Sequence, residues 1–338
     1  MTNPDIIEQR ATQAGRGREA KRPGEIPWAG WKDIVRRVIK EMIEDRIMLV
    51  AAGITFFLVL ALFPALAAIV SLYGLFADPA GVTASLSYVE GVLPEPGIEL
   101  IRSQLTDLAS QNRQAVGLGF LASFAIAFWS ANNGVKALFE GMNVAYNEKE
   151  KRGFLKLTAL SFVFTIGAML LFILLFAIVG VIPAVLGFVD LGAVTDILVR
   201  VGRWALMVLL VIVAIGLLYK FGPSRAKPQV RWISTGGILA SIVWIVVSIG
   251  FSFYLQNFAN YNATYGSLGA AIGFMVWIWI SVLIVLVGAE LNGEMEMQTA
   301  EDTTTGAPEP IGRRGAVVSD SLGAASGEES DGGTRPRS

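Results

Sequence analysis

Neutral polar side chains are the groups with which this chain can do chemistry at the ends of its long apolar stretches. Ser130, Asn132 and Asn133 lie together at the end of one stretch. A second group precedes another stretch and consists of Asn257, Asn260, Tyr261, Asn262, Thr264, Tyr265 and Ser267. Amides, hydroxyls and phenols form hydrogen bonds without carrying charge. Both groups are therefore candidates for contact with the polar part of a neutral or amphiphilic substrate.

Each polar group also has a structural interpretation. Asn132 and Asn133 can cap a helix or hydrogen-bond to a neighbouring span, and this role is favoured over substrate contact. Around Asn260 and Tyr265, an interfacial belt of aromatic and turn residues explains the pattern as well as a site for a polar headgroup does.

Glu290 and Asn292 stand at the end of the last apolar stretch and are candidates for substrate contact or gating. A carboxylate near the C-terminus of a helix is unfavourable, so we expect a compensating cation. Lys136 and Lys220 lie at a matching depth in the predicted membrane. A structural salt bridge is slightly favoured over gating.

Small residues and one proline mark positions of packing or bending. Gly266, Gly269 and Gly273 give one helix face the small-residue spacing that lets two backbones approach closely. Tight packing against a second span or a second copy is favoured over a backbone-lined pathway. Pro64 predicts a kink in the first apolar stretch, and a hinge there is the less favoured alternative.

Several kinds of chemistry are excluded by residue type. The chain has no His and no Cys, which removes thiolate metal sites, cysteine nucleophiles and the commonest general base. A net charge of -1 supplies no basic field for a nucleic-acid partner. We therefore predict no catalytic residues, no metal site, no cofactor and no enzyme activity.

The elements that position these residues are membrane-spanning helices. Of 338 residues, 54% are hydrophobic and 16% charged, with a mean hydropathy of +0.57, which is far from the balance of a soluble domain. Uncharged apolar stretches long enough to cross a bilayer occur six times. The sequence predicts an all-α, six-span bundle with spans near 47–76, 115–135, 157–182, 204–219, 233–256 and 268–289.

The distribution of Lys and Arg predicts the orientation of the bundle. The segments before the first span and after the second, fourth and sixth carry 10, 5, 4 and 4 of these residues. The other three connecting segments carry 2, 2 and 0. Because basic residues concentrate on the cytoplasmic side, both termini are expected in the cytoplasm.

Outside the spans, the composition predicts three further features. Residues 1–27 and 298–338 are polar and aperiodic, which is typical of disordered cytoplasmic tails around a membrane domain at 28–297. From Trp31, apolar residues recur at helical spacing with Lys32, Arg36 and Arg37 on the opposite, polar face, which predicts an amphipathic helix either in the membrane interface or against the bundle. The outer loop near 78–114 is expected to form two amphipathic helices.

Several short motifs occur over residues 45–292, among them Ala61-Leu62-Phe63-Pro64 and Ser130-Ala131-Asn132-Asn133-Gly134. The most specific are Tyr265-Gly266-Ser267-Leu268-Gly269-Ala270 and Gly288-Ala289-Glu290-Leu291-Asn292. Together these motifs resemble those of the YihY/virulence factor BrkB family of bacterial inner-membrane proteins. The resemblance implies a six-helix fold in the bacterial plasma membrane and a link to virulence. It also brings the label ribonuclease BN, which does not fit a chain that lacks His and Cys.

The absence of ionisable residues from the spans decides between classes of transport. Ion-coupled transporters commonly place such residues in mid-membrane, and here each apolar stretch is uncharged. We expect the protein to move a lipid or another amphiphilic envelope component, with membrane lipids as partners. The alternative is a membrane scaffold or assembly factor, with a second copy or an envelope protein as partner.

Overall fold

The computed structural model describes residues 4–76, 113–176, 178, 192–257 and 269–328. The described part contains eight α-helices and one short 3-10 helix, η1 (Pro23–Glu25), and no strand is found in it. Two short or amphipathic helices come first, α1 (Pro4–Ala11) and α2 (Trp28–Glu44). The predicted all-α class is confirmed.

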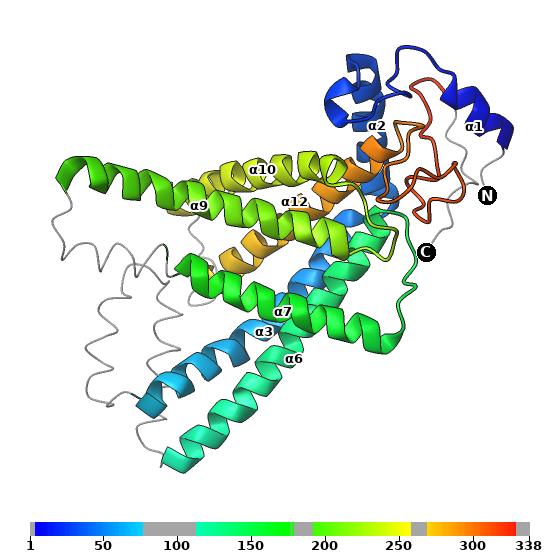
Figure 1. The fold of residues 1–338 in the computed structure, drawn as a ribbon. Helices are drawn as coiled ribbons and strands as arrows, with labels where there is room; N and C mark the ends of the chain where they lie inside the picture. Colours follow the sequence, from blue (N-terminus) through cyan, green and yellow to red (C-terminus); the bar gives the residue numbers. More distant parts are fainter. Residues whose placement is uncertain (1–3, 77–112, 177, 179–191, 258–268, 329–338) are drawn as a thin grey trace. The chain divides into compact units, whose positions relative to one another are not determined.

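Long helices lie at each of the six predicted span positions (Figure 1). They are α3 (Ile47–Phe76), α6 (Arg113–Ala145), α7 (Phe154–Phe176), α9 (Gly192–Phe221), α10 (Val230–Asn257) and α12 (Gly269–Glu296). The fourth was expected to be short, at 204–219, but α9 has 30 residues. It begins earlier than expected because its backbone is already helical at Asp196, Arg200 and Arg203. The prediction had placed these charged residues in the loop before the span.

Four of the long helices, α7, α9, α10 and α12, are apolar enough over the described residues to cross a membrane. In each of these helices, between 11% and 22% of the most apolar 18 residues are buried inside the protein, so most of those residues keep part of their surface exposed. Exposed apolar helix sides of this kind match a lipid environment. The protein is therefore a membrane protein, whereas the count of six spans stays a prediction. The predicted outer-loop helices lie outside the described residues.

The chain divides into two compact units. The first contains Met1–Val50, Leu138–Ile245 and Leu283–Ser338, and the second contains Ala51–Ala137 and Val246–Val282. Four helices, α3, α6, α10 and α12, contribute residues to both units. The first unit holds both ends of the chain and all the residues of the candidate site described below.

In the second unit, small residues bring helices together. A Cβ at Gly134 of α6 would lie 2.8 Å from Leu58 Cδ2 of α3. A Cβ at Gly273 of α12 would lie 3.5 Å from Leu255 Cδ2 of α10, an ordinary contact distance. Trp277 Nε1 donates a hydrogen bond of 3.2 Å to Ser248 Oγ between the same two helices. Glycine in α6 thus permits a closer approach than glycine in α12.

One face of α2 belongs to the core of the first unit. Ile34 and Val38 pack with residues from the N-terminal segment, α10 and α12, and the cluster consists of Ala20, Ile26, Ile34, Val38, Trp232, Leu291 and Met295. Arg37 was expected on the polar face, but its side chain is buried and donates to the Glu294 side chain and the Ala324 carbonyl. Packing against the bundle is the role that this face fulfils.

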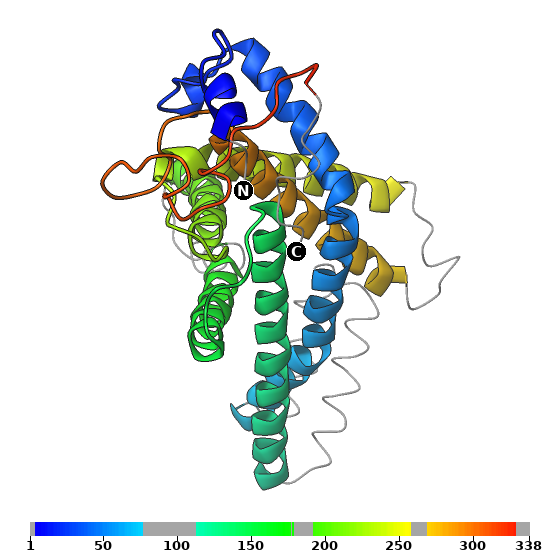
Figure 2. The same ribbon diagram turned by 90° about the vertical axis from the view of Figure 1, so that its right-hand side faces the viewer.

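The two tails differ from the disorder that composition predicted. Residues 4–27 and 298–328 lie against each other and against α2 and α12 (Figure 2). Arg18 donates to the carbonyl of Gly323 at 2.7 Å, and the amide of Ala300 donates to the carbonyl of Arg18 at 2.7 Å. Hydrogen bonds to backbone groups hold these segments where apolar side chains are scarce.

The C-terminal segment also pairs with the loop between α9 and α10. The Gln229 amide donates to the Thr303 carbonyl at 2.8 Å, and the Thr305 amide donates to the Lys227 carbonyl at 2.9 Å. These two bonds flank an antiparallel bridge between Pro228 and Thr304. The segment is therefore anchored at both of its ends.

Arg314 is expected to organise the C-terminal segment. Its guanidinium donates to four carbonyls at 2.7–3.0 Å, those of Ala300, Glu301, Glu309 and Ser319. Arg314→Ala leaves these carbonyls without their donor, so we expect amide exchange across 300–320 to become faster. Hydrogen–deuterium exchange measures this effect, with the exposed neighbour Arg313→Ala as control. Equal exchange in the two variants would contradict the role.

Candidate functional site: a buried polar junction

A buried ion pair forms the centre of a polar cluster at the ends of α6, α9, α10 and α12. Arg225 Nη2 donates to both carboxylate oxygens of Glu296 at 2.8 Å, and both side chains are 0% exposed. Thr303 donates to the same carboxylate at 2.6 Å. The Arg225 guanidinium also lies 4.6 Å from the centre of the Tyr146 ring. We call this cluster, with Asn143, Asn292 and their partners below, the polar junction.

Tyr146 contributes a neutral ring to the polar junction. Its side chain is fully buried, and burial raises the pKa of its phenol well above the ordinary value of 10.0. The nearby Arg225 charge opposes this shift without cancelling it. The ring therefore stays uncharged and stabilises the guanidinium through its π face.

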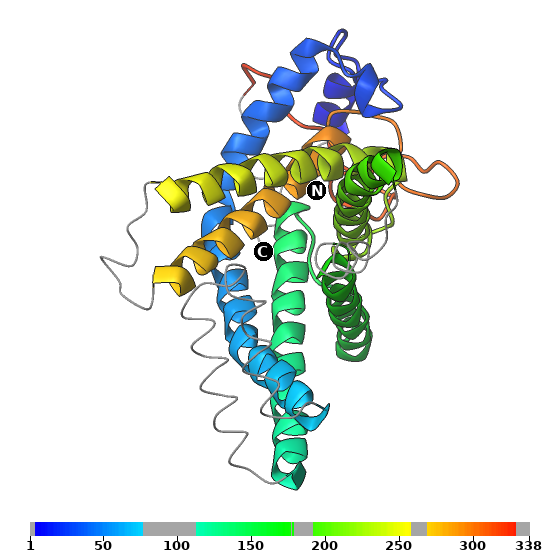
Figure 3. The ribbon, with the colours of Figure 1, turned by 90° about the vertical axis from the view of Figure 1, so that its left-hand side faces the viewer.

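Asn292 joins α12 to α10. Its Oδ1 accepts a hydrogen bond of 3.0 Å from the amide of Gly236, and its Nδ2 donates to the carbonyl of Ile233 at 3.3 Å. The two helices run side by side here (Figure 3). A Cβ at Gly236 would collide with the Asn292 side chain and lie 2.6 Å from the Gly288 carbonyl oxygen. Only glycine permits this approach without a shift of backbone.

Tyr219 extends the same contact to α9. Its hydroxyl donates to the Val285 carbonyl at 2.8 Å, and a Cβ at Gly288 would collide with that hydroxyl. Three helices thus meet where Gly236 and Gly288 leave room for polar side chains. Gly236 and Gly288 are therefore positions of close packing.

Asn143 and Glu150 connect α6 to the loop after α9. Asn143 Oδ1 accepts a hydrogen bond of 2.7 Å from the Ser224 amide, and its Nδ2 donates to Glu150 at 3.2 Å. Arg152 donates to Glu150 at 2.6 and 2.7 Å and to the carbonyls of Phe221 and Gly222. The last carbonyls of α9, which lack partners within the helix, are satisfied in this way.

Glu150 predicts a dependence of stability on pH. Burial alone would raise its pKa, but hydrogen bonds from Arg152 and Asn143 outweigh burial and lower the pKa from 4.5 to about 2. Because the pKa is lower in the folded than in the unfolded protein, the ionised carboxylate stabilises the fold at pH values above the unfolded pKa. This stabilisation is lost as the pH falls towards about 2. We expect the difference in melting temperature between the parent and Glu150→Gln to be constant from about pH 8 to 5 and to shrink below 4.5. A difference that does not change between pH 5 and 3 would contradict this prediction.

Acidic side chains accumulate at the C-terminal end of α12, where the helix dipole disfavours them. Glu290, Glu294 and Glu296 are all buried. Glu296 is compensated by Arg225, and Glu294 accepts a hydrogen bond from Arg37. Compensation of these two carboxylates by cations therefore holds the end of α12 in place. The partner predicted for Glu290, Lys136 or Lys220, stays a prediction.

The structure places the sequence-predicted site residues in three groups. Glu290 and Asn292 are buried on α12 at the polar junction. Asn132 is buried on α6 in the second unit, and Asn133 is half-buried beside it. The predicted outer group, Asn260, Tyr261, Tyr265 and Ser267, lies outside the described residues, as does Gly266.

Three of the four residues predicted for packing or bending, Pro64, Gly269 and Gly273, lie within helices. Pro64 is in α3 and Gly269 is at the start of α12, at positions whose side chains are not described. A Cβ added at Gly273 would lie 3.5 Å from Leu255 Cδ2, and the packing role of Gly273 stays a prediction. The hinge at Pro64 and the role of Gly269 stay predictions.

Sequence reasoning missed the partners that complete the polar junction. Arg225, Glu296 and Arg37 were not selected as site residues because they lie outside the apolar stretches. A signal was present, since Glu290, Glu294 and Glu296 accumulate at a helix end that must be neutralised. The predicted topology places loops rich in Lys and Arg near this helix end. These loops were the expected source of the neutralising cations.

The polar junction combines paired charges with hydrogen bonds, and among the described residues Arg225 Nη1 is a buried donor without a hydrogen-bond acceptor. Arg225 and Glu296 neutralise each other, and the Asn292 amide bonds to two α10 backbone groups. Such a network fixes the ends of four helices relative to one another. The network therefore positions the helix ends of a membrane protein.

Comparison with known proteins identifies the family. The model of the family described as virulence factor BrkB matches residues 38–311, which include α3 to α12 and the polar junction. The chain belongs to the virulence factor BrkB family. The predicted resemblance is therefore confirmed. No solved structure matches the chain significantly.

Relatives of this BrkB-family protein occur in several bacteria. It is 33% identical to the ribonuclease-like protein YfkH of Bacillus subtilis over 249 residues, which is 72% of this chain and 87% of that protein. It is 25% identical to a UPF0761 membrane protein of Vibrio vulnificus, over 81% of this chain and 87% of the relative. For a UPF0761 membrane protein of Kangiella koreensis the identity is 25%, over 77% of this chain and 63% of the relative.

Proposed function

We propose that this BrkB-family protein moves a lipid or another amphiphilic envelope component across or within a bacterial plasma membrane. The observation that carries the proposal is the separation of charge from the spans. Charged residues are absent from 47–77, 157–189 and 232–289, whereas the ionised side chains of the polar junction gather at the helix ends. A substrate that keeps its apolar part in lipid needs no charge in mid-membrane.

The outward-facing sides of the spans support an amphiphilic substrate. Apolar side chains on α7, α9 and α10 are exposed along the helices, including Leu170, Phe172, Leu209 and Ile249. Acyl chains can contact such surfaces while a headgroup passes neutral polar residues. The predicted headgroup contacts are Asn132, Asn133, Asn260, Tyr261, Tyr265 and Ser267.

The location and orientation belong to the same proposal. The relatives named above are bacterial, and two of them, those of Vibrio vulnificus and Kangiella koreensis, are named as membrane proteins. The excess of Lys and Arg in alternate segments supports cytoplasmic termini. The ribonuclease-like name belongs to the Bacillus protein, and the absence of His and Cys here argues against transferring that activity.

A membrane scaffold is the second candidate, and the folded tails favour it. Residues from both ends of the chain form one layer over α2 and the end of α12, held by Arg18, Arg37 and Arg314. A layer of this kind offers a surface on which another envelope protein can assemble. It would also explain a polar junction in which buried charges are paired without any substrate.

Variants in the predicted outer group test the transport proposal. Purified protein is placed in liposomes that contain a fluorescent phospholipid, and the rate at which label crosses the bilayer is measured. Asn260→Ala and Tyr265→Ala are expected to slow this movement, whereas the exposed Thr305→Ala matches the parent. If all three variants move lipid at the parent rate, the outer group is not the headgroup site.

A further inference from the structure

A stripe of α2 faces away from the protein although it is largely apolar. Trp28, Val35, Ile39 and Ile43 are exposed by 74%, 50%, 56% and 73%. Their spacing of seven, four and four residues places them on one side of the helix, with Lys32 between them. The opposite side is the buried face that contains Ile34 and Val38. We call Trp28, Lys32, Val35, Arg36, Ile39 and Ile43 the α2 stripe.

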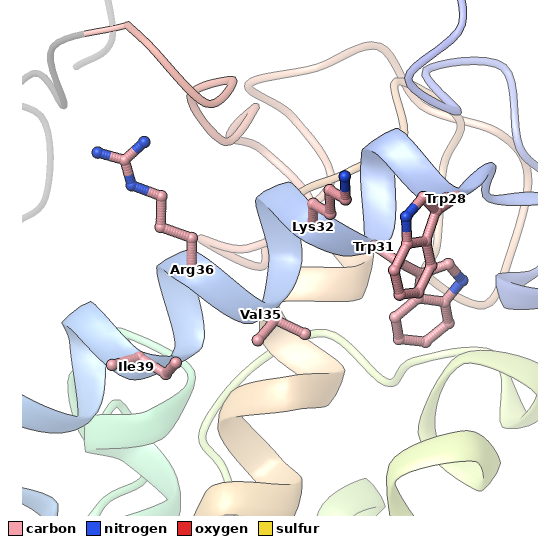
Figure 4. Close-up of a pocket in the computed structure, with 6 residues that line it drawn as sticks. All are labelled: Trp28, Trp31, Lys32, Val35, Arg36 and Ile39. Atoms are coloured by element: carbon pink, nitrogen blue, oxygen red, sulfur yellow. The ribbon is translucent and has the colours of Figure 1, made fainter.

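The α2 stripe carries a shallow groove with a basic edge. A volume of about 440 Å³ is lined by Trp28, Trp31, Lys32, Val35, Arg36 and Ile39. Figure 4 shows Val35 and the two tryptophan rings below the helix in this view, and Lys32 and Arg36 projecting from its upper edge. Lys32 Nζ lies 5.8 Å from the centre of the Trp28 ring. Apolar, aromatic and cationic groups therefore meet at one surface.

The acidic residues of α2 do not neutralise the positive charge of Lys32 and Arg36. Asp33 and Glu41 are buried on the opposite face, and Asp33 pairs with Arg16 at 2.6 Å. Glu44, at the last residue of the helix, lies 3.5 Å from Lys40. The stripe itself contains two cations and no anion, so its charge is complementary to an anionic surface.

The position of α2 in the chain directs the stripe towards lipid. Two residues, Asp45 and Arg46, separate α2 from the apolar helix α3, and Arg46 turns the chain with a φ of 51°. Directly after the turn, Met48 and Leu49 are exposed apolar side chains of α3. Exposed apolar residues thus continue from the end of the stripe into the first predicted span.

We propose that the α2 stripe binds the surface of the adjacent leaflet through anionic phospholipids. Val35, Ile39 and the tryptophan rings enter the boundary between headgroups and acyl chains, and Lys32 and Arg36 contact the phosphates. Apolar area alone would give weak attachment, and the two cations make it selective for anionic lipid. The binding of the α2 stripe to the membrane surface is independent of the proposed transport function.

A spin label tests the depth of the stripe in the full-length protein. The chain has no Cys, so Val35→Cys provides a single labelling position. Ala307→Cys is the matched control, because Ala307 is exposed in the C-terminal segment. In liposomes with anionic phospholipid, the label at 35 is expected to collide more with oxygen and less with a water-soluble nickel complex than the label at 307.

Removal of charge tests the selectivity. With Lys32→Gln and Arg36→Gln added, collisions of the label at 35 with the nickel complex are expected to rise several-fold, since each cation near an anionic membrane changes surface affinity roughly fivefold. The matched double change Lys21→Gln and Arg22→Gln alters two other exposed basic residues and is expected to leave the label unchanged. The parent label is expected to lie deeper in anionic than in zwitterionic liposomes.

Two results would overturn the proposal. The first is equal access of the nickel complex to positions 35 and 307 in anionic liposomes, which would show that the stripe faces water. The second is dipolar broadening of the label at 35 that disappears when unlabelled protein is added in excess. That outcome would assign the stripe to contact with a second copy of the chain.

Discussion

Arg225→Met is expected to lower the free energy of unfolding by roughly 3–5 kcal/mol, because it leaves the Glu296 carboxylate buried without its cation. Arg225 and Glu296 are each 0% exposed, and Arg225 bonds to both carboxylate oxygens. Removal of one partner from such a pair costs more than the pair contributes, since the remaining charge cannot be hydrated. The hydrogen bond from Thr303 to the Glu296 carboxylate is too weak to compensate for the lost cation.

Denaturant unfolding of the detergent-solubilised protein measures this loss. The matched control is Arg22→Met, which removes the same side chain from an exposed pair with Glu25 at 2.7 Å. An exposed pair contributes about 0–1 kcal/mol, so the control is expected to stay close to the parent. Equal effects of the two substitutions would show that the Arg225–Glu296 pair does not hold the helix ends together.

Gly236→Ala is expected to be the second most damaging change, with a loss of roughly 1–3 kcal/mol. The new methyl group would occupy the position of the Asn292 side chain and press on the Gly288 carbonyl of α12. Backbone on the opposing helix cannot move aside as a flexible side chain can. The substitution therefore separates α10 from α12 and breaks the Asn292 hydrogen bonds.

Gly250→Ala on the same helix is the control. A Cβ at Gly250 would meet nothing within 4 Å, so the added methyl group has room. Alanine is favoured over glycine in a helix by up to about 1 kcal/mol, and we expect a stability equal to or slightly above that of the parent. If both variants unfold at the same denaturant concentration, close approach at Gly236 is not needed for the fold.

The helices were predictable, and the reason is the length of their apolar stretches. The expected first span at 47–76 coincides with α3 (Ile47–Phe76), and 233–256 lies within α10 (Val230–Asn257). The ends were less predictable, since α6 continues to Ala145, ten residues beyond the expected boundary at 135. Hydropathy marks membrane crossing, whereas a helix can extend past the lipid wherever its polar residues find partners.

The tails and the polar junction depend on partners distant in sequence, which composition does not reveal. Arg18 and Gly323 are 305 residues apart, and Arg225 and Glu296 are 71 apart. Composition indicated disorder for the tails because apolar residues are scarce there. Hydrogen bonds from arginines to carbonyls provide order there, together with a few buried apolar side chains such as Ile26, Val318 and Leu322. Asn292 was selected as a candidate for substrate contact or gating, and its hydrogen bonds to Gly236 and Ile233 could be found only from coordinates.

The α2 helix shows how one pattern allows two interpretations. Periodicity from Trp31 predicted an amphipathic helix that either lies in the interface or packs on the bundle. The structure places Ile34 and Val38 in the core and leaves Val35 and Ile39 exposed. Packing on the bundle is thus observed for one face, and interfacial binding is proposed for the other.

Transbilayer movement of a fluorescent phospholipid by the unmodified protein tests the central claim most directly. Liposomes with and without the protein are treated with a membrane-impermeant quencher, which reaches label only in the outer leaflet. We expect label from the inner leaflet also to become accessible in the liposomes with protein, faster than in empty liposomes. Equal rates in both, across several lipid compositions, would contradict lipid movement by this protein alone and favour the scaffold.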